Sequence, residues 1–382
     1  MGKLYDTIAR LAAQRAQDVP HGDVLTPDRL LDLPSFGSNP GALRSRYYLP
    51  ENLPEGAPLV VVLHGCTQNA ARYDRGSGWS QLADQAGFAL LFPEQQRSNN
   101  PNLCFNWFLP ADMRRGSGEA LSIYQMIEAV VSIHGFDRRR IFVTGLSAGG
   151  AMALVMLATY PEVFAGGAII AGLPYGSANT VQEAFDRMRG NGGPSERDLQ
   201  RRLRGASQYQ GTWPTLSIWQ GSADLTVAPS NADAVVGQWR DVHKLGKSPT
   251  RSEMVDGQNR RVWCDASGTE VIEAYTIDGM GHGTALKTRG DDGLGATAPF
   301  MLDVGISSTR HIANFWGIAS SGRPAAGKLR QKKPEASQSA QRSHDRATTE
   351  TAAQSSRPKR KSDSNAVRKI IEHAMRSAGL MR

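Results

Sequence analysis

A serine stands on the turn between a predicted strand and a predicted helix. Apolar residues at 141–145 predict the strand, Gly145-Leu146-Ser147-Ala148-Gly149 forms the turn, and residues 149–160 have the composition of a buried helix. A strand and a helix joined by so short a turn approach closely, and the flanking glycines leave room for this. Gly-x-Ser-x-Gly alone is a weak signal in a chain with 40 glycines. Its place between strand and helix favours an exposed, nucleophilic serine.

Strands and helices alternate along the chain around this turn. Alternation predicts an α/β fold, with a mostly parallel sheet and helices on both faces. The predicted strands are 46–49, 59–64, 88–93, 141–145, 167–171, 215–220 and 271–277, the last of them being the final strand. The predicted helices are 79–86, 119–134, 149–160, 179–189, 196–206, 230–245 and a closing helix at 307–316.

Composition divides the chain into parts. Residues 321–382 hold 15 basic and 5 acidic residues, a net charge of +10, while the rest holds 29 basic and 31 acidic residues. We therefore expect a lead-in with one amphipathic helix over 1–35, a globular domain over 36–320, and a disordered basic tail over 321–382. A short amphipathic helix is predicted near the end of the tail from the helical spacing of Val367, Ile370, Ile371 and Ala374.

Several classes of protein are excluded by what the sequence lacks. It has no run of about 18 apolar residues, which a membrane-spanning helix requires. Its three cysteines match no zinc spacing, no phosphate-binding loop is present, and no cluster of metal ligands stands out, so we expect neither metal nor cofactor. Three cysteines allow one disulfide and one free thiol. The first 16 residues lack the apolar core of a secretory signal, which predicts a cytoplasmic location.

A serine nucleophile needs a general base and an acid that orients the base. His282 lies in a glycine-flanked loop after the last predicted strand, where it can return over Ser147. Asp224 follows strand 215–220 and is the preferred acid. The alternative acid is Asp278, which precedes the histidine loop and would have to fold back.

Acyl transfer also needs donors for the developing oxyanion. The Ala148 N–H, directly after the nucleophile, is one candidate, and the Cys66 N–H, in the loop after strand 59–64, is the second. His64 stands at the end of that strand, before Ser147 in chain order. We interpret it as a hydrogen-bonding residue that shapes the loop.

Five motifs, in this order, resemble the polyhydroxybutyrate (PHB) depolymerase family of esterases over roughly residues 36–317: Leu63-His64-Gly65-Cys66-Thr67-Gln68, Cys104-Phe105-Asn106-Trp107-Phe108, Gly145-Leu146-Ser147-Ala148-Gly149-Gly150, Tyr160-Pro161-Glu162-Val163-Phe164-Ala165 and Gly279-Met280-Gly281-His282. The resemblance implies an α/β-hydrolase fold and hydrolysis of short-chain hydroxyalkanoate esters. It implies a triad of Ser147, Asp224 and His282, with the Cys66 and Ala148 N–H groups as the oxyanion hole. Relatives include feruloyl and acetylxylan esterases.

The chain differs from secreted members of that family. It shows no signal peptide, and a basic tail stands where they carry a linker and a polymer-binding domain. In secreted relatives cysteines near the first motif can be bridged, whereas a cytoplasmic chain would keep Cys66 and Cys104 reduced. We therefore expect soluble oligomers, small esters or an intracellular store as substrates, with an extracellular location as the alternative. Three aromatic residues are expected to line the acyl or alcohol pocket or else to pack in the core: Phe105, Trp107 and Phe108.

Two other classes of function stay open at this point. The first is a binding protein on a hydrolase scaffold, in which the tail binds an anionic surface such as a granule, a membrane or nucleic acid. The second is a serine peptidase of the same fold, although such enzymes usually carry a large extra domain for which this chain has no room.

Overall fold

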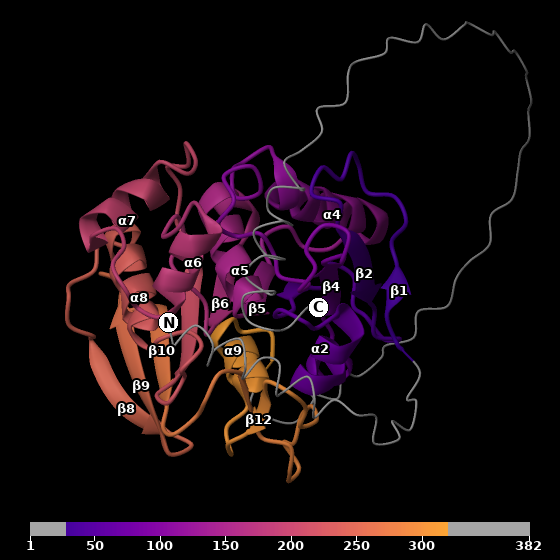
Figure 1. Cartoon of the computed structure of the whole chain (residues 1–382). Coiled ribbons are helices and arrows are strands. Elements are labelled where there is room, and N and C mark those ends of the chain that lie inside the picture. Colours follow the sequence, from indigo (N-terminus) through magenta and orange to yellow (C-terminus); the bar gives the residue numbers. More distant parts are fainter. Residues whose placement is uncertain (1–27, 320–382) are drawn as a thin grey trace, which may run out of the picture. The chain divides into compact units, whose positions relative to one another are not determined.

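The computed structural model describes residues 28–319. Its centre is a ten-stranded sheet (Figure 1). In spatial order the strands are β1 (Leu31–Asp32), β2 (Arg44–Tyr48), β4 (Ala89–Glu94), β3 (Leu59–Leu63), β5 (Ile141–Leu146), β6 (Gly166–Ile170), β7 (Thr215–Gly221), β10 (Glu270–Ile277), β9 (Gln258–Cys264) and β8 (Arg251–Val255).

The six central strands, from β4 to β10, run parallel, and antiparallel strands flank them on both sides. Parallel strands end at the same edge of a sheet, so the loops that follow them can form one site. The helices are α2 (Ala70–Ser77), α3 (Trp79–Ala86), α4 (Gly118–His134), α5 (Ala148–Thr159), the 3-10 helix η1 (Pro161–Val163), α6 (Val181–Met188), α7 (Glu196–Arg204), α8 (Ser230–Val242) and α9 (Ser308–Phe315).

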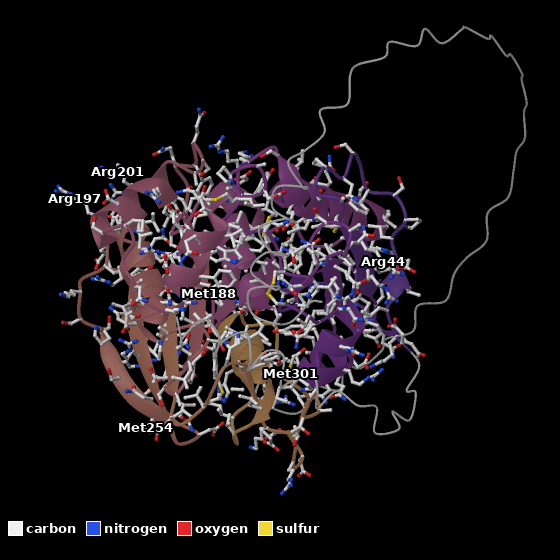
Figure 2. The ribbon with its side chains drawn as sticks, in the orientation of Figure 1. Arg44, Met188, Arg197, Arg201, Met254 and Met301 are labelled. Carbon is white, nitrogen blue, oxygen red and sulfur yellow. A yellow bond between two sulfur atoms is a disulfide. The ribbon has the colours of Figure 1, made fainter. Side chains whose placement is uncertain are left out.

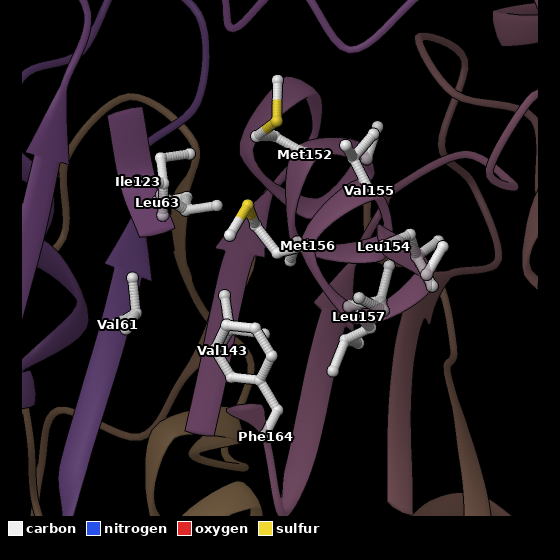
Figure 3. Packing of buried hydrophobic residues seen from close by; sticks show 14 of the residues in the cluster. Val61, Leu63, Ile123, Val143, Met152, Leu154, Val155, Met156, Leu157 and Phe164 are labelled. Carbon is white, nitrogen blue, oxygen red and sulfur yellow. The ribbon is translucent and has the colours of Figure 1, made fainter. Parts of the chain in front are cut away.

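Both faces of the sheet are covered, and the sequence of β3 shows why. Leu59, Val61 and Leu63 pack into one apolar cluster with α4, α5 and α8. The alternate residues Val60 and Val62 pack into a second cluster with α2, α3 and α9. A strand buried on both faces is apolar throughout, and valine suits the extended backbone. Figure 3 shows Leu63 of β3 and Met156 of α5 among the residues of the first cluster.

The two ends of the sheet differ from its middle. β1 is only two residues long. β8 is largely exposed, and its charged residues form ion pairs, Arg251 with Glu270 and Glu253 with Arg260. Met254 of β8 is 68% exposed and is labelled in Figure 2 on the side of the molecule away from Arg44 of β2.

Some elements differ from the expectations. The strand at 271–277 is not the last, because β11 (Thr284–Leu286) and β12 (Met301–Asp303) follow it and pair in a small parallel sheet. The β8–β9 hairpin and α2 were not predicted. The fold also begins before residue 36, since β1 pairs with β2 and its neighbours Leu30 and Leu33 are buried. The predicted helices in 1–35 and in the tail lie outside the described residues.

Candidate active site

Ser147 occupies a strained turn between β5 and α5. Its φ of 57° and ψ of −116° lie in a region that residues other than glycine rarely adopt. A Cβ atom at Gly145 would lie 2.4 Å from the Gly149 carbonyl carbon, and one at Gly149 would lie 2.4 Å from the Leu63 carbonyl oxygen. Only glycine fits at both positions. The predicted reason for the two flanking glycines is therefore confirmed.

Backbone hydrogen bonds join the loops that follow neighbouring strands. The Ser147 N–H donates to the Ile170 carbonyl (2.8 Å), which ties the loop after β5 to β6. Farther along the edge, the Ser222 N–H donates to Ile277 (2.9 Å) and the Ala223 N–H to Met280 (3.0 Å). These bonds hold the loop after β7 against the loop after β10. The loops that carry Ser147, Asp224 and His282 thus lie along one edge of the sheet.

Asp224 and His282 are in direct contact. Nδ1 of His282 lies 2.7 Å from Oδ2 of Asp224, and Asp224 is only 2% exposed. A carboxylate oxygen only accepts, so Nδ1 carries the hydrogen and Nε2 of the neutral ring keeps its lone pair. The other oxygen, Oδ1, accepts from the Thr226 and Val227 N–H groups at 2.8 and 2.9 Å. This set of bonds fixes both the carboxylate and the imidazole tautomer.

Asp278 does not contact the imidazole. It is exposed, and its carboxylate accepts a hydrogen bond from the Ser222 hydroxyl at 3.2 Å. The structure therefore pairs His282 with Asp224 rather than with the alternative acid. Ser147 is 8% exposed. Its hydroxyl makes no hydrogen bond to any residue between 28 and 319, and neither does Nε2 of His282.

The loop after β3 lies beside the serine turn, because Leu63 pairs with Gly145 in the parallel β3–β5 ladder. Within the described part of the chain, the Cys66 N–H has no acceptor. The Ala148 N–H has none either, since Ala148 is the first residue of α5 and cannot bond within the helix. Two free amide donors thus stand on adjacent strand ends near Ser147.

Cys66 and Cys104 form a disulfide, a question that the sequence left open. The bond links the loop after β3 to the long loop before α4, and the Thr67 N–H reinforces the link by donating to the Asn102 carbonyl at 2.7 Å. Such bonds persist in oxidising compartments. The cytoplasmic location expected above is not tested by this and stays a prediction. Cys264 is free.

His64 shapes the loop as expected. Its Nε2 accepts from the Gln95 N–H (3.1 Å), so Nδ1 carries the hydrogen and donates to the Gly65 carbonyl (2.8 Å). The ring is 1% exposed and lies 5.0 Å from the Phe105 ring centroid. Burial lowers the pKa of His64 to about 4, so the ring is neutral at neutral pH.

This burial gives a pH prediction. The unfolded chain binds a proton at His64 near pH 6.5, whereas the folded protein does so only near pH 4. The folded protein therefore keeps its full free energy of unfolding above about pH 6.5. As the pH falls towards 4, the free energy of unfolding decreases by at most roughly 3 kcal/mol on account of His64. We expect the wild type to lose more stability than His64→Gln between pH 7 and 4.5 in urea unfolding. Parallel pH profiles would contradict this, because other titrating groups are common to both proteins.

The three aromatic residues of the Cys104–Phe108 motif differ in how deeply they are buried. Phe105 has no exposed surface and packs in the core, so its expected place in the pocket lining is wrong and the core alternative holds. Trp107 is 5% exposed and packs edge-on against Phe108, with 5.3 Å between ring centroids. Phe108 is half-buried against the core. Of the three, Phe108 has the most surface to offer a substrate.

One buried residue at the site was not predicted. Gln220 is 3% exposed, and its Nε2 donates to Oδ2 of Asp224 at 3.0 Å and to the Val227 carbonyl at 3.1 Å. It shares that carboxylate oxygen with His282. The available signal was a polar residue near the end of a predicted strand, four positions before Asp224.

Within residues 28–319, no group of three or more His, Cys, Asp or Glu side chains could hold a metal ion. No helix in that range has both the length and the apolar character needed to cross a membrane.

Two surface hollows lie away from Ser147, Asp224 and His282. One is beside Arg260 and His311, and the other is beside His243 and Cys264.

Comparison with known proteins agrees with this geometry. The family model "Esterase PHB depolymerase" matches residues 43–248, which include Cys66, Ser147 and Asp224, while His282 lies beyond the match. Poly(3-hydroxyalkanoate) depolymerase C of Paucimonas lemoignei is 45% identical over 293 residues, 76% of this chain and 70% of that protein. Feruloyl esterase B of Talaromyces stipitatus is 29% identical over 262 residues, 66% of this chain and 72% of that protein.

A solved structure shows the same fold. Acetyl xylan esterase from Aspergillus awamori superposes with a TM-score of 0.65 at 24% identity, covering 76% of this chain and 99% of that one. The sheet order, the serine turn and the relatives together confirm the α/β-hydrolase fold and the suspected family. The chain belongs to the esterase PHB depolymerase family and is a carboxylic ester hydrolase.

Proposed function

We propose that this protein hydrolyses hydroxyalkanoate esters through an acyl-enzyme on Ser147. The observation that carries the proposal is the contact between His282 and the buried Asp224, on loops along the same sheet edge as the strained Ser147 turn. The relative at 45% identity, a poly(3-hydroxyalkanoate) depolymerase, supports the substrate class.

In the proposed reaction, Oγ of Ser147 attacks the ester carbonyl carbon and its proton passes to Nε2 of His282. The carbonyl oxygen becomes an oxyanion, which the N–H groups of Cys66 and Ala148 stabilise. The C–O bond to the alcohol then breaks, and the leaving oxygen takes the proton from His282. Water repeats the sequence on the acyl-enzyme and releases the acid, while Asp224 stabilises the imidazolium in each half of the reaction.

A hydrolysis panel tests the substrate class. The panel compares p-nitrophenyl esters, 3-hydroxybutyrate oligomers, feruloyl esters and acetylated xylan, with kcat/KM as the measurement. We expect the oligomers to be cleaved with the highest kcat/KM among the natural substrates. A preference for feruloyl esters or acetylated xylan would reassign the substrate. No hydrolysis of any ester would favour the binding-protein alternative.

We also propose that the basic tail binds an anionic surface. The support is its net charge of +10 and the apolar stripe near its end, both outside the described residues. Wild type and a chain ending at Ala319 are compared in co-sedimentation with anionic vesicles at low and high salt. We expect tail-dependent, salt-sensitive sedimentation and equal kcat on a soluble ester. Equal sedimentation of the two proteins would contradict the proposal.

A further inference from the structure

A buried carboxyl group lies behind the loop that carries Cys66. Glu119, in the first turn of α4, has no exposed surface. Its Oε1 accepts from the side-chain amides of Gln95 (2.7 Å), Asn106 (2.7 Å) and Asn99 (3.2 Å), and its Oε2 accepts from the Asn106 N–H (2.8 Å). All four donors belong to the segment that follows β4. One side chain therefore gathers this segment onto α4.

Two routes lead from Glu119 to the residues around the Cys66 N–H. In the first, Gln95 donates its own N–H to His64, and His64 donates to the Gly65 carbonyl, one residue before Cys66. In the second, the side chain of Gln95 donates also to the Cys104 carbonyl at 3.0 Å, and Cys104 is bonded to Cys66. Gln95 is 2% exposed, so no solvent competes with these contacts.

The backbone of the two linked loops is strained. Thr67 and Leu103 have φ values of 66° and 54°, in the left-handed region that favours glycine. Such conformations persist only where surrounding contacts over-determine them. The disulfide, the Thr67–Asn102 hydrogen bond and the bonds to Glu119 are contacts of this kind.

Burying a carboxyl group costs free energy, so the buried position of Glu119 calls for a structural reason. Burial and the nearby Asp112 carboxyl raise the pKa of Glu119 to about 8, while the hydrogen bonds from Asn106 and Gln95 act in the opposite direction. An apolar residue would avoid this cost. A carboxyl group, however, has two acceptor oxygens, so Glu119 can accept several N–H groups at once and can orient them.

We propose that Glu119 is a positioning residue for ester hydrolysis, which holds the Cys66 N–H toward the oxyanion through Gln95, His64 and the Cys66–Cys104 disulfide. This rests on the proposed function, in which Cys66 donates to the oxyanion. Glu119 touches no reacting atom. Its effect is to keep the loop after β3 and the loop before α4 in one fixed arrangement.

The test compares Glu119→Gln with a matched control, Glu273→Gln. Glu273 is also a buried carboxyl, 1% exposed and bonded to Ser217 and Arg260, but it lies on β10 and has no link to the Cys66 loop. Gln95→Met is a second variant that removes the amide bridge and keeps the backbone N–H to His64. Thermal unfolding identifies the temperature at which all variants are folded.

Two readouts separate positioning from general destabilisation. We expect kcat on a soluble p-nitrophenyl ester to fall about 10- to 100-fold in Glu119→Gln and Gln95→Met, with KM changed less than two-fold. Affinity for a trifluoromethyl ketone, whose adduct carries an oxyanion, should fall in parallel. The second readout is the rate at which dithiothreitol reduces the Cys66–Cys104 bond, which should rise in both variants. Glu273→Gln should match the wild type in both readouts.

The outcomes are distinct. An unchanged kcat in folded Glu119→Gln overturns the inference, and so does a lower kcat without loss of ketone affinity. An unchanged reduction rate shows that Glu119 does not hold the two loops and overturns it as well. A wild-type protein that hydrolyses no ester in the panel overturns the proposed function, and with it the positioning role of Glu119 in hydrolysis. In that case a faster reduction in Glu119→Gln still shows its hold on the loops.

Discussion

Ser147→Ala is expected to lower kcat on a soluble ester by three or more decades while the protein stays folded. The substitution removes the nucleophile and leaves only the remaining oxyanion donors and substrate binding to lower the barrier. A methyl side chain adds no bulk to the strained turn, so the fold should survive. The measurements are steady-state kinetics and circular dichroism on the same preparations.

His282→Ala provides the matching control. It should cost nearly as much as Ser147→Ala, and the double variant should be little worse than either, because nucleophile and base act as a unit. Additive losses would show that the two residues work independently. Retention of more than about a tenth of wild-type activity in Ser147→Ala would remove Ser147 from the proposed mechanism.

Asp224→Asn is expected to leave a folded enzyme with a kcat lower by several orders of magnitude. The asparagine side chain can turn its NH2 group toward Nδ1 of His282, which favours the tautomer that carries its hydrogen on Nε2. That tautomer cannot accept the serine proton. Kinetics on a soluble ester measure the loss, and urea unfolding shows whether the protein stays folded.

Asp278→Asn is the matched control, since Asp278 is exposed and hydrogen-bonded to Ser222 instead of His282. It should change kcat little. If Asp278→Asn were the more damaging substitution, the orienting role would pass to Asp278, and the arrangement in the structure would not be the working one.

The sequence predicts the structure most accurately where a functional residue lies in a segment whose strand, turn or helix can also be recognised from the sequence. The serine turn has a strand before it, a helix after it and two glycines that no other residue can replace, and each of these is visible along the chain. The acid and the base could be placed because parallel strands end at one edge. Asp224 could be preferred to Asp278 because Asp278 precedes the histidine loop and would have to fold back to reach His282, and the hydrogen bond between Asp224 and His282 agrees with that choice.

The parts that could not be predicted depend on contacts between distant segments. The β8–β9 hairpin has polar residues on both faces, so no apolar alternation marks it. Phe105 and Phe108 stand in the same motif, yet Phe105 has no exposed surface and Phe108 is half-buried. This difference arises only when the folded chain brings Phe105 into the first apolar cluster. In the sequence, Glu119 resembles any acidic residue in the first turn of a helix. Its special role depends on four N–H donors from the segment that follows β4, which only the folded structure brings to it.

The sheet is open at both ends, and open ends carry unpaired N–H and C=O groups that can recruit a strand from another molecule. β1 offers only two residues as a template. At the other end, a strand added to β8 would cover Arg251 and Glu253 and strip water from their charges. The exposed Met254 alone is too small an apolar area to offset that cost. In the described part of the chain, the short length of β1 and the charged residues of β8 therefore oppose edge-to-edge aggregation of the folded protein.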